Sequence, residues 1–240
     1  MKKVLALTLV IVSLAFTMVG CFLFETPETP EVNPNEKSEG TMTYEQYVAA
    51  NLDDAVVIEG FVQGKQSWWD NKATIYLQDG DGAYFVYEMT CSEEDYAKLT
   101  IGTKIKVTGY KTEYHGEIEV DSGATFEIIE GVNWVATPTD VTSLLGKDEI
   151  ADKQNMLVTF TGMTVKAISF KGGQPGDDIY VTLTKDGAEY SFCVEVYLTG
   201  TDTDVYKAVE ALKEGDVIDV EGFLYWYDGI NPHITKITVK

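Results

Sequence analysis

Arginine is absent from this chain. All 18 basic residues are lysines, against 39 Asp and Glu, which gives a net charge of −21. Arginine is the side chain that binds phosphate and guanine through two parallel hydrogen bonds, so its absence argues against a phosphate-centred function. A strongly acidic surface also repels nucleic acid at long range. The composition therefore disfavours a nucleic-acid partner, although it leaves one possible.

Residues able to carry out catalysis are also scarce. The two histidines are His115 and His233, and no serine or cysteine is accompanied by an identifiable base. The zinc-binding spacings C-x-x-C and H-E-x-x-H do not occur. Asp79 and Asp81 faintly resemble a calcium loop, but its terminal glutamate is missing and turn formation explains both residues. We therefore expect a protein that is not an enzyme and that has no metal and no cofactor.

The three cysteines do not form the dense, even set of a disulfide scaffold. Cys91 and Cys193 lie in strand-like runs, one in each half of the chain, where we expect buried free thiols. Cys21 has a different setting. It ends an N-terminal segment in which Lys2 and Lys3 precede an apolar run too short to span a bilayer comfortably.

Residues 18–21 read MVGC. This resembles the lipobox of bacterial lipoproteins. Its usual form is Leu at the first position, a small residue or Val at the second, Gly or Ala at the third, and Cys at the fourth. Met18 departs from the favoured Leu. The resemblance implies that residues 1–20 are a signal peptide and that Cys21 is lipidated, which would anchor the chain on the extracytoplasmic side of a bacterial membrane. An uncleaved anchor or an ordinary signal peptide is the alternative.

Residues 21–40 are predicted to be a disordered tether. Its part 22–40 contains three prolines, five glutamates and one lysine. Proline fixes φ and lacks a backbone donor, and like charges repel one another, so such a segment stays extended. We expect it to hold the folded part of the chain away from the membrane.

The remainder consists of two copies of one unit. The segment 99–116 (LTIGTKIKVTGYKTEYHG) aligns with 212–229 (LKEGDVIDVEGFLYWYDG) at an offset of 113. Further upstream, 56–62 aligns with 158–164 at an offset of 102. The offset grows along the chain, as loop insertions in a duplicated domain produce. We therefore predict two domains, 41–131 and 132–240.

Each copy is predicted to contain three strands, a helix and two strands. Residues 79–82 (DGDG) are typical of a hairpin turn, and 43–46 (TYEQ) predict a capping box that opens a short lead-in helix. This order is that of the OB-fold, a five-stranded Greek-key barrel. The predicted fold class is all-β with short helices, in two tandem OB-fold-like barrels. The predicted strands are 56–64, 73–78, 84–90, 104–112 and 118–129 in the first copy and 157–169, 178–184, 188–197, 216–226 and 233–239 in the second, with helices from Ser92 and over 203–213.

The first copy resembles the OB-fold modules of bacterial secreted and lipoprotein surface proteins. Those modules carry an E-G-x-V first strand, a Y-x-Q-D-G-x-G hairpin, V-G-x-x-V-x-V-x-G and Y-x-G. The matching residues here are EGFV at 59–62, YLQDGDG at 76–82, IG at 101–102 with VTG at 107–109, and YHG at 114–116. The resemblance covers nearly all of the first copy and the second half of the second, whose hairpin reads TKDG. It implies an architecture and not an activity.

Aromatic residues occupy the loops through which an OB barrel binds its ligands, namely those after its first and fourth strands. Successive strand residues face opposite sides, so at least one of each aromatic cluster should be exposed, where its ring can stack on a base or a sugar. Alternatively, these rings cover the barrel mouth or form the contact between the copies. The candidate ligand-binding residues are Trp68, Trp69, Tyr114, Tyr225, Trp226 and Tyr227.

Two functional hypotheses follow. The first is a membrane-anchored lipoprotein that acts as a non-catalytic binding module for a surface sugar, a peptide or a protein. The alternative is a nucleic-acid-binding accessory to an extracellular nuclease or a DNA-uptake system. That alternative needs a stripe of lysines, for which the first copy offers Lys65, Lys104, Lys106 and Lys111.

Overall fold

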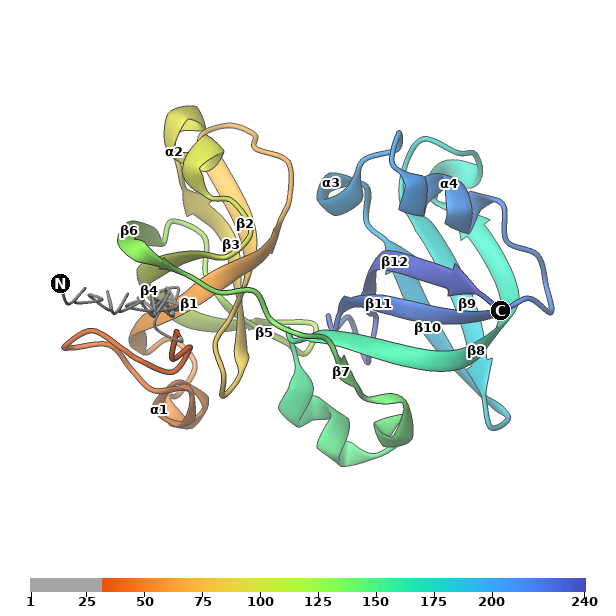
Figure 1. The fold of residues 1–240 in the computed structure, drawn as a ribbon, viewed down its shortest axis with the longest axis horizontal. Coiled ribbons are helices and arrows are strands. Elements are labelled where there is room, and N and C mark those ends of the chain that lie inside the picture. The colour runs from red at the N-terminus through yellow and green to blue at the C-terminus, as the bar shows by residue number, and fades with distance from the viewer. Residues whose placement is uncertain (1–31) are drawn as a thin grey trace, which may run out of the picture. The chain divides into compact units, whose positions relative to one another are not determined.

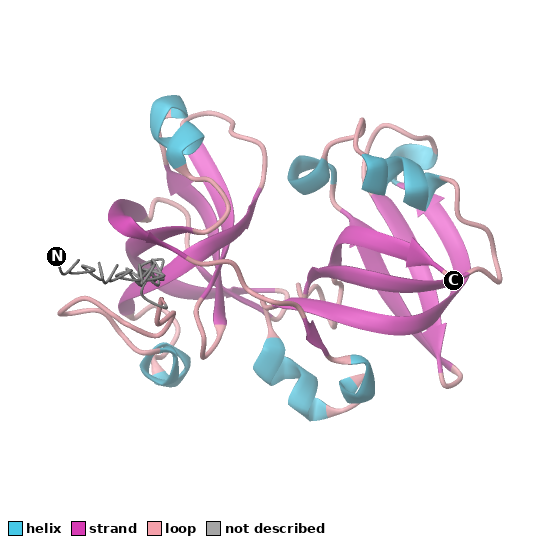
Figure 2. Cartoon of the chain, viewed as in Figure 1, coloured by secondary structure: helices cyan, strands magenta, loops and turns pink. Residues whose placement is uncertain are grey.

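The structure, a computed structural model, describes residues 32–240. The predicted signal peptide, Cys21 and the tether up to residue 31 lie outside this range. Within the described range, no helix has both the length and the apolar character that crossing a membrane requires. Two β-barrels follow one another along the chain (Figure 1, Figure 2).

The first barrel closes in the manner of an OB-fold. Strand β1 pairs antiparallel with β4, and β3 pairs parallel with β5, so the sheet returns to its own beginning. The predicted fifth strand is divided in two by a turn at residues 121–124. The elements are α1 (Tyr44–Ala49), β1 (Ala55–Lys65), β2 (Lys72–Gln78), β3 (Ala83–Thr90), α2 (Glu93–Lys98), β4 (Thr103–Tyr114), β5 (Glu117–Val120) and β6 (Thr125–Asn133).

The second barrel repeats this topology, since β11 pairs antiparallel with β8 and β10 pairs parallel with β12. The prediction of an all-β chain with two tandem OB-fold-like barrels is therefore confirmed. The elements are β7 (Thr139–Asp140), η1 (Thr142–Leu144), η2 (Asp148–Lys153), β8 (Leu157–Phe170), η3 (Lys171–Gly173), β9 (Ile179–Lys185), β10 (Ala188–Val194), α3 (Val196–Thr199), α4 (Asp204–Glu210), β11 (Val217–Phe223) and β12 (His233–Val239).

Local signals account for most element boundaries. Thr43 and Gln46 form the predicted capping box of α1, and Ser92 caps α2 by accepting a hydrogen bond from the Asp95 N–H. The predicted strand 188–197 is too long. The observed strand β10 stops at Val194, because the Glu195 carboxylate accepts two backbone N–H groups and so caps the short helix α3. The predicted strand 216–226 likewise ends earlier, at Phe223.

Each barrel has its own apolar core. The inward alternation predicted for β4 is correct, since Ile105 and Val107 are fully buried. In the second barrel, Phe160 and Phe192 meet edge to face with ring centroids 5.0 Å apart. Full burial of one such side chain contributes about 1.5–3 kcal/mol, so these alternating positions supply most of the stabilisation of each barrel.

Residues 32–40 differ from the predicted extended tether, because they lie on the first barrel. The Ser38 N–H donates to the carboxylate of Glu59, which is fully buried on β1. Lys104 forms an ion pair with the same carboxylate at 3.2 Å. A buried carboxylate is stable only with such partners, and the sequence pattern did not reveal that Glu59 would need them.

The β2–β3 hairpin shows the turn chemistry predicted for Asp79. Its carboxylate accepts the N–H groups of Asp81 and Gly82 at 2.8 and 2.7 Å and the hydroxyl of Tyr84 at 2.9 Å. It also forms an ion pair with Lys37 at 2.6 Å. Asp79 therefore fixes the turn and fastens the segment that precedes α1.

The two barrels belong to one compact unit, Val32–Lys240. On the outer face of β2, the ring of Tyr76 stacks on Phe223 at the end of β11, with centroids 4.1 Å apart and planes inclined by 5°. A hydrogen bond of 2.8 Å joins the Tyr76 hydroxyl to Nδ1 of His233 on β12. Gly64 allows this approach, because a Cβ atom there would lie 2.6 Å from the Phe223 ring. We call these contacts the barrel junction.

We predict that protonation of His233 weakens the fold. Burial lowers the pKa of its imidazole to about 3, so the folded chain prefers the neutral ring. The stabilisation is complete above the ordinary pKa of about 6.5 and is lost as the pH falls below it, by about 2 kcal/mol at pH 5. Denaturant unfolding at pH 7 and pH 5 should show this extra loss in the wild type relative to His233→Gln, which keeps a polar partner for Tyr76 but does not titrate. An equal loss in both proteins would refute the assignment.

Candidate ligand-binding site

A cleft of about 930 Å³ lies beside the loop that joins β1 to β2. We call it the tryptophan cleft. It is lined by residues 66–69, 72, 74, 87 and 88 of the first barrel and by 176, 177, 196, 197, 200 and 201 of the second. It thus includes the loop after the first OB strand and part of the β2–β3 surface, where OB barrels commonly hold their ligands.

The loop is held in a defined conformation. The Tyr96 hydroxyl donates to the Gln66 carbonyl at 2.7 Å, and the Ser67 N–H donates to the Tyr197 carbonyl of the second barrel at 2.6 Å. The indole N–H of Trp68 donates to the Cys91 carbonyl at 2.9 Å. Trp68 therefore anchors the loop, and a turn with Trp69 paired to Lys72 carries the next ring outward.

Three aromatic side chains of the cleft are exposed. Trp69 is 63% exposed, Tyr197 60% and Tyr87 39%. The exposure of Trp69 agrees with the expectation that one of the two adjacent tryptophans lies outside the barrel. Exposed rings that share one cleft can each stack on a flat ligand, and this arrangement is the main chemical resource of the site.

The charged groups of the cleft are already paired. Lys72 forms an ion pair with Glu88 at 2.7 Å, and this hydrogen bond lowers the pKa of the Glu88 carboxyl. The second Glu88 oxygen accepts the Tyr87 hydroxyl at 3.2 Å. Glu88 itself has φ +44, a strained value for a residue other than glycine, and its N–H donates to the Thr74 hydroxyl. The backbone at this point of β3 thus departs from regular strand geometry beside the exposed rings.

A second cavity, of about 260 Å³, shares Gln66 and Tyr87 with the cleft and therefore adjoins it. We call it the tyrosine pocket, and its remaining lining residues are Phe85, Tyr114, Glu119, Tyr225 and His233. Burial raises the pKa of Glu119 to about 7, and the neighbouring Asp121 carboxylate adds to this shift. The pocket therefore contains a carboxyl group that titrates near neutral pH.

The other predicted aromatic residues lie at the contact between the copies. Tyr225 stacks on His233 at 4.3 Å, and the Trp226 N–H donates to Glu117 of β5 at 2.9 Å. Tyr227, which is 49% exposed, lies 6.1 Å from Tyr114 between ring centroids. The alternative that these rings form the contact between copies thus describes the 225–227 group, whereas Trp68 and Trp69 line a cleft.

Residues at equivalent positions of the repeat meet here. His115 and Asp228, which align at the offset of 113, are joined by a hydrogen bond of 3.0 Å, and the Asp228 N–H donates to the His115 carbonyl at 2.8 Å. Tyr114 and Tyr227 are equivalent in the same way. The two turn tips therefore contact each other much as identical patches do across a two-fold dimer interface.

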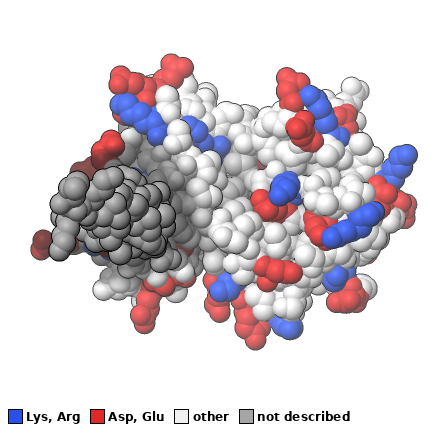
Figure 3. Space-filling view, in the orientation of Figure 1, with Lys and Arg blue, Asp and Glu red and all other residues white. Residues whose placement is uncertain are grey.

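The four lysines that a nucleic-acid track would need in the first copy have partners within the protein instead. Lys104 is buried against Glu59, and Lys111 donates to the carbonyls that end α1. Lys65 donates to the Tyr96 carbonyl, and Lys106 to that of Glu39. On the face that Figure 3 shows, basic and acidic side chains are interspersed. These lysines hold the chain's own backbone, so they do not form a track for phosphates.

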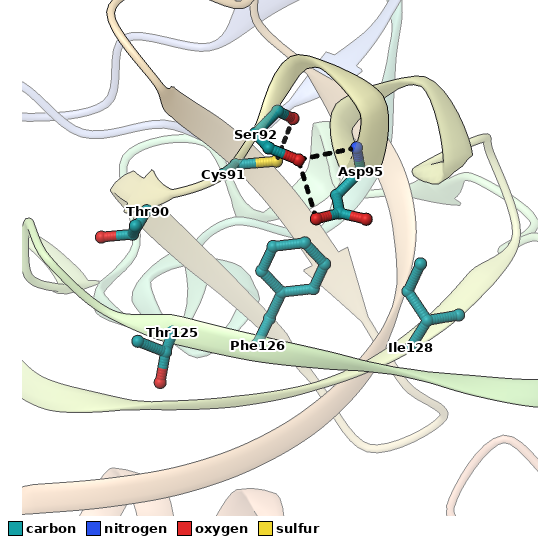
Figure 4. Close-up of a pocket in the computed structure, with 7 residues that line it drawn as sticks. All are labelled: Thr90, Cys91, Ser92, Asp95, Thr125, Phe126 and Ile128. Carbon is teal, nitrogen blue, oxygen red and sulfur yellow. Dashed lines mark hydrogen bonds between the residues drawn. The ribbon is translucent and has the colours of Figure 1, made fainter.

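A third cavity, of about 490 Å³, is lined by Thr90, Cys91, Ser92, Asp95, Thr125, Phe126 and Ile128 (Figure 4). Its polar groups serve the start of α2, since the Ser92 hydroxyl accepts the Asp95 N–H and donates to the Asp95 carboxylate. Burial raises the pKa of the Cys91 thiol to about 11, so it is not the reactive thiolate at neutral pH. Both described cysteines are buried and free, as predicted.

Sequence reasoning missed several residues of these cavities. Tyr87 could have been found, because strand alternation places it opposite the buried Val86. Tyr197 and Glu119 carried no comparable signal. Tyr197 reaches the cleft only because its carbonyl binds the Ser67 N–H, and Glu119 faces a pocket that needs both barrels.

No protein-family model and no curated protein matches the chain. Among solved structures with a similar fold is "Structure of murine DNA binding protein bound with ds DNA", with 12% identity over 76% of this chain and 94% of that one, at a TM-score of 0.38. The Ifi202 HINa domain in complex with 20-bp dsDNA has 11% identity over 78% and 98%, at 0.35. A replication protein A heterotrimer bound to ssDNA has 11% identity over 78% and 49%, at 0.33.

These DNA-bound structures contradict the prediction that nucleic acid is a disfavoured partner. The physical reason is that a net charge describes the whole surface, whereas stacking of bases on aromatic rings is a local interaction that every base can make. The absence of arginine removes bidentate hydrogen bonding to phosphate and guanine, but it does not affect the stacking of bases on aromatic rings. The prediction of a sugar or peptide ligand gains no support from the comparisons.

We predict that Glu119→Gln stabilises the chain at alkaline pH. Because the folded-state pKa of Glu119 is raised, the fold favours its protonated form, and this contribution is complete below pH 4.5 and lost as the pH rises through 7. The wild type and Glu119→Gln should therefore have similar free energies of unfolding at pH 4.5, whereas at pH 8 the variant should be about 2 kcal/mol more stable. The exposed Glu127, changed in the same way, is the control and should show no such divergence.

Proposed function

We propose that the chain is a non-catalytic binding module that takes up single-stranded nucleic acid in the tryptophan cleft. The lipid on Cys21 would hold it on the outer side of a bacterial membrane. The observation that carries the proposal is the exposure of Trp69, Tyr87 and Tyr197 around one cleft. An extended strand can stack successive bases on such rings, at roughly 1–3 kcal/mol per base.

The polar groups of the cleft fit bases better than sugar hydroxyls. Both Glu88 oxygens are engaged, by Lys72 and by the Tyr87 hydroxyl. Oδ1 of Asp177 accepts the N–H of Asp178 and lies 3.5 Å from Nζ of Lys171. Three of these four carboxylate oxygens are thus occupied, which leaves few acceptors for a sugar, whereas stacking requires only the open faces of the rings.

The phosphates of a bound strand would face the solvent, because the described lysines near the cleft have partners within the protein. Binding should therefore depend only weakly on salt. With no more than one phosphate neutralised, affinity should fall less than about threefold between 50 and 200 mM salt.

We predict that Trp69→Ala and Tyr197→Ala each weaken the binding of oligothymidylate about tenfold, since each removes one stacking surface. Tyr110→Ala is the matched control, because Tyr110 on β4 is 61% exposed against 60% for Tyr197. Fluorescence anisotropy of a labelled oligonucleotide, with the full chain in non-ionic detergent, measures both the affinities and the salt dependence.

Two outcomes would overturn the proposal. Equal losses in Tyr110→Ala and Tyr197→Ala would show that the cleft is not the site. A response to a glycan panel without any response to oligonucleotides would reassign the ligand class.

A further inference from the structure

We propose that the tyrosine pocket binds a small organic ammonium ion. The pocket adjoins the tryptophan cleft, but this proposal does not rest on the nucleic-acid function. Its volume of about 260 Å³ lies below the roughly 300–1,000 Å³ of sites for drug-sized ligands, so its occupant is small.

Aromatic rings form the walls of the pocket. Phe85 and Tyr225 meet edge to face at 5.4 Å, and Tyr225 stacks on His233. Tyr87 and Tyr114 are partly exposed and complete the open side. Rings grouped around a small space attract a cation through their negative faces, which is how aromatic cages recognise quaternary ammonium groups.

Glu119 supplies the charge that a cation would neutralise. The residue is only 6% exposed and lines the pocket. Within residues 32–240 the Glu119 carboxylate has no hydrogen-bond partner, whereas the neighbouring Glu117 accepts the backbone N–H of Trp226 through Oε2 and leaves its buried Oε1 without a partner. Ionising a carboxyl in a residue so far from solvent is costly when no cation lies beside it, and an ammonium group in the pocket would reduce that cost.

The groups that face Glu119 add no positive charge. Its neighbours along the chain are Glu117 on β5 and Asp121 just after that strand, and its paired residues are Phe85 of β3 and Thr112 of β4. Tyr87 and Tyr114 line the same pocket. From the second barrel come Tyr225 and His233, and burial keeps the imidazole of His233 neutral at ordinary pH. An anionic ligand would meet only repulsion here, whereas a cation would meet a carboxylate and polarisable rings.

The affinity for a cation should depend on pH, because only the ionised Glu119 attracts it. With a pKa of about 7, the ionised fraction rises about tenfold between pH 6 and pH 8. The neighbouring Asp121, Glu117, Tyr87, Tyr114 and Tyr225 remain as they are in a Glu119→Gln variant, so that variant isolates the contribution of this one carboxyl.

Calorimetric titration of the full chain in non-ionic detergent with choline chloride tests the proposal. We expect saturable binding that tightens about tenfold from pH 6 to pH 8, and no binding of 3,3-dimethylbutan-1-ol, the neutral isostere of choline. Glu119→Gln should weaken choline binding about tenfold and abolish its pH dependence. Tyr114→Ala, at a half-exposed ring, should weaken it severalfold.

Glu127→Gln is the matched control, since it removes one exposed carboxylate from the same barrel, and it should bind choline as the wild type does. Equal binding of choline and its neutral isostere, or unchanged affinity in Glu119→Gln, would overturn the proposal, as would the absence of any choline binding. These outcomes are independent of the oligonucleotide experiment, because the Trp69 and Tyr197 variants leave the tyrosine pocket intact.

Discussion

The stacking of Tyr76 on Phe223, closed by the hydrogen bond to His233, is the contact on which the rest of the structure depends. It covers part of the outer β2–β3 face of the first barrel, which in an isolated OB-fold is open to ligand. Because that face is occupied, only its margins remain open. Both the tryptophan cleft and the tyrosine pocket lie at these margins and take residues from both barrels. The contact between the barrels thus creates the candidate sites.

The barrel junction combines stacked rings with one polar pair, and the titratable groups in and beside it remain uncharged. Burial keeps the His233 imidazole neutral and raises the pKa of Glu117 well above its usual range. A neutral hydrogen-bonded pair costs much less to bury than an ion does. The stability of the fold should therefore fall at both acid and alkaline pH, because acid charges the histidine and alkali charges the carboxyls. An ammonium ion beside Glu119 would stabilise the ionised carboxyl and so extend the stable range upward.

The barrels could be predicted from the sequence because OB strands are set by local alternation and by turn residues. The capping box at Thr43 and the hairpin turn at Asp79 are signals of this kind, and both were correct. The four candidate lysines and residues 32–40 lie against the first barrel for a shared reason. Buried acceptors such as Glu59 and the carbonyls at the end of α1 recruit lysines and a chain segment from far along the sequence. No local pattern reveals which acceptors are buried.

Duplication did not produce two equivalent sites. Tyr180 occupies in the second copy the position that Tyr76 occupies in the first, yet Tyr180 is 39% exposed and Tyr76 is 1% exposed. The turn tips meet through equivalent residues, His115 and Asp228, whereas the strand faces do not meet in that way. A contact that buries one copy's face and leaves the other's open cannot be a symmetric one. The outer β2–β3 face of the first barrel is therefore partly covered by the second. Because the loop at 171–178 of the second copy has no aromatic residue, Trp69 is the exposed ring that a loop of this kind contributes, and it shares the tryptophan cleft with Tyr87 and Tyr197.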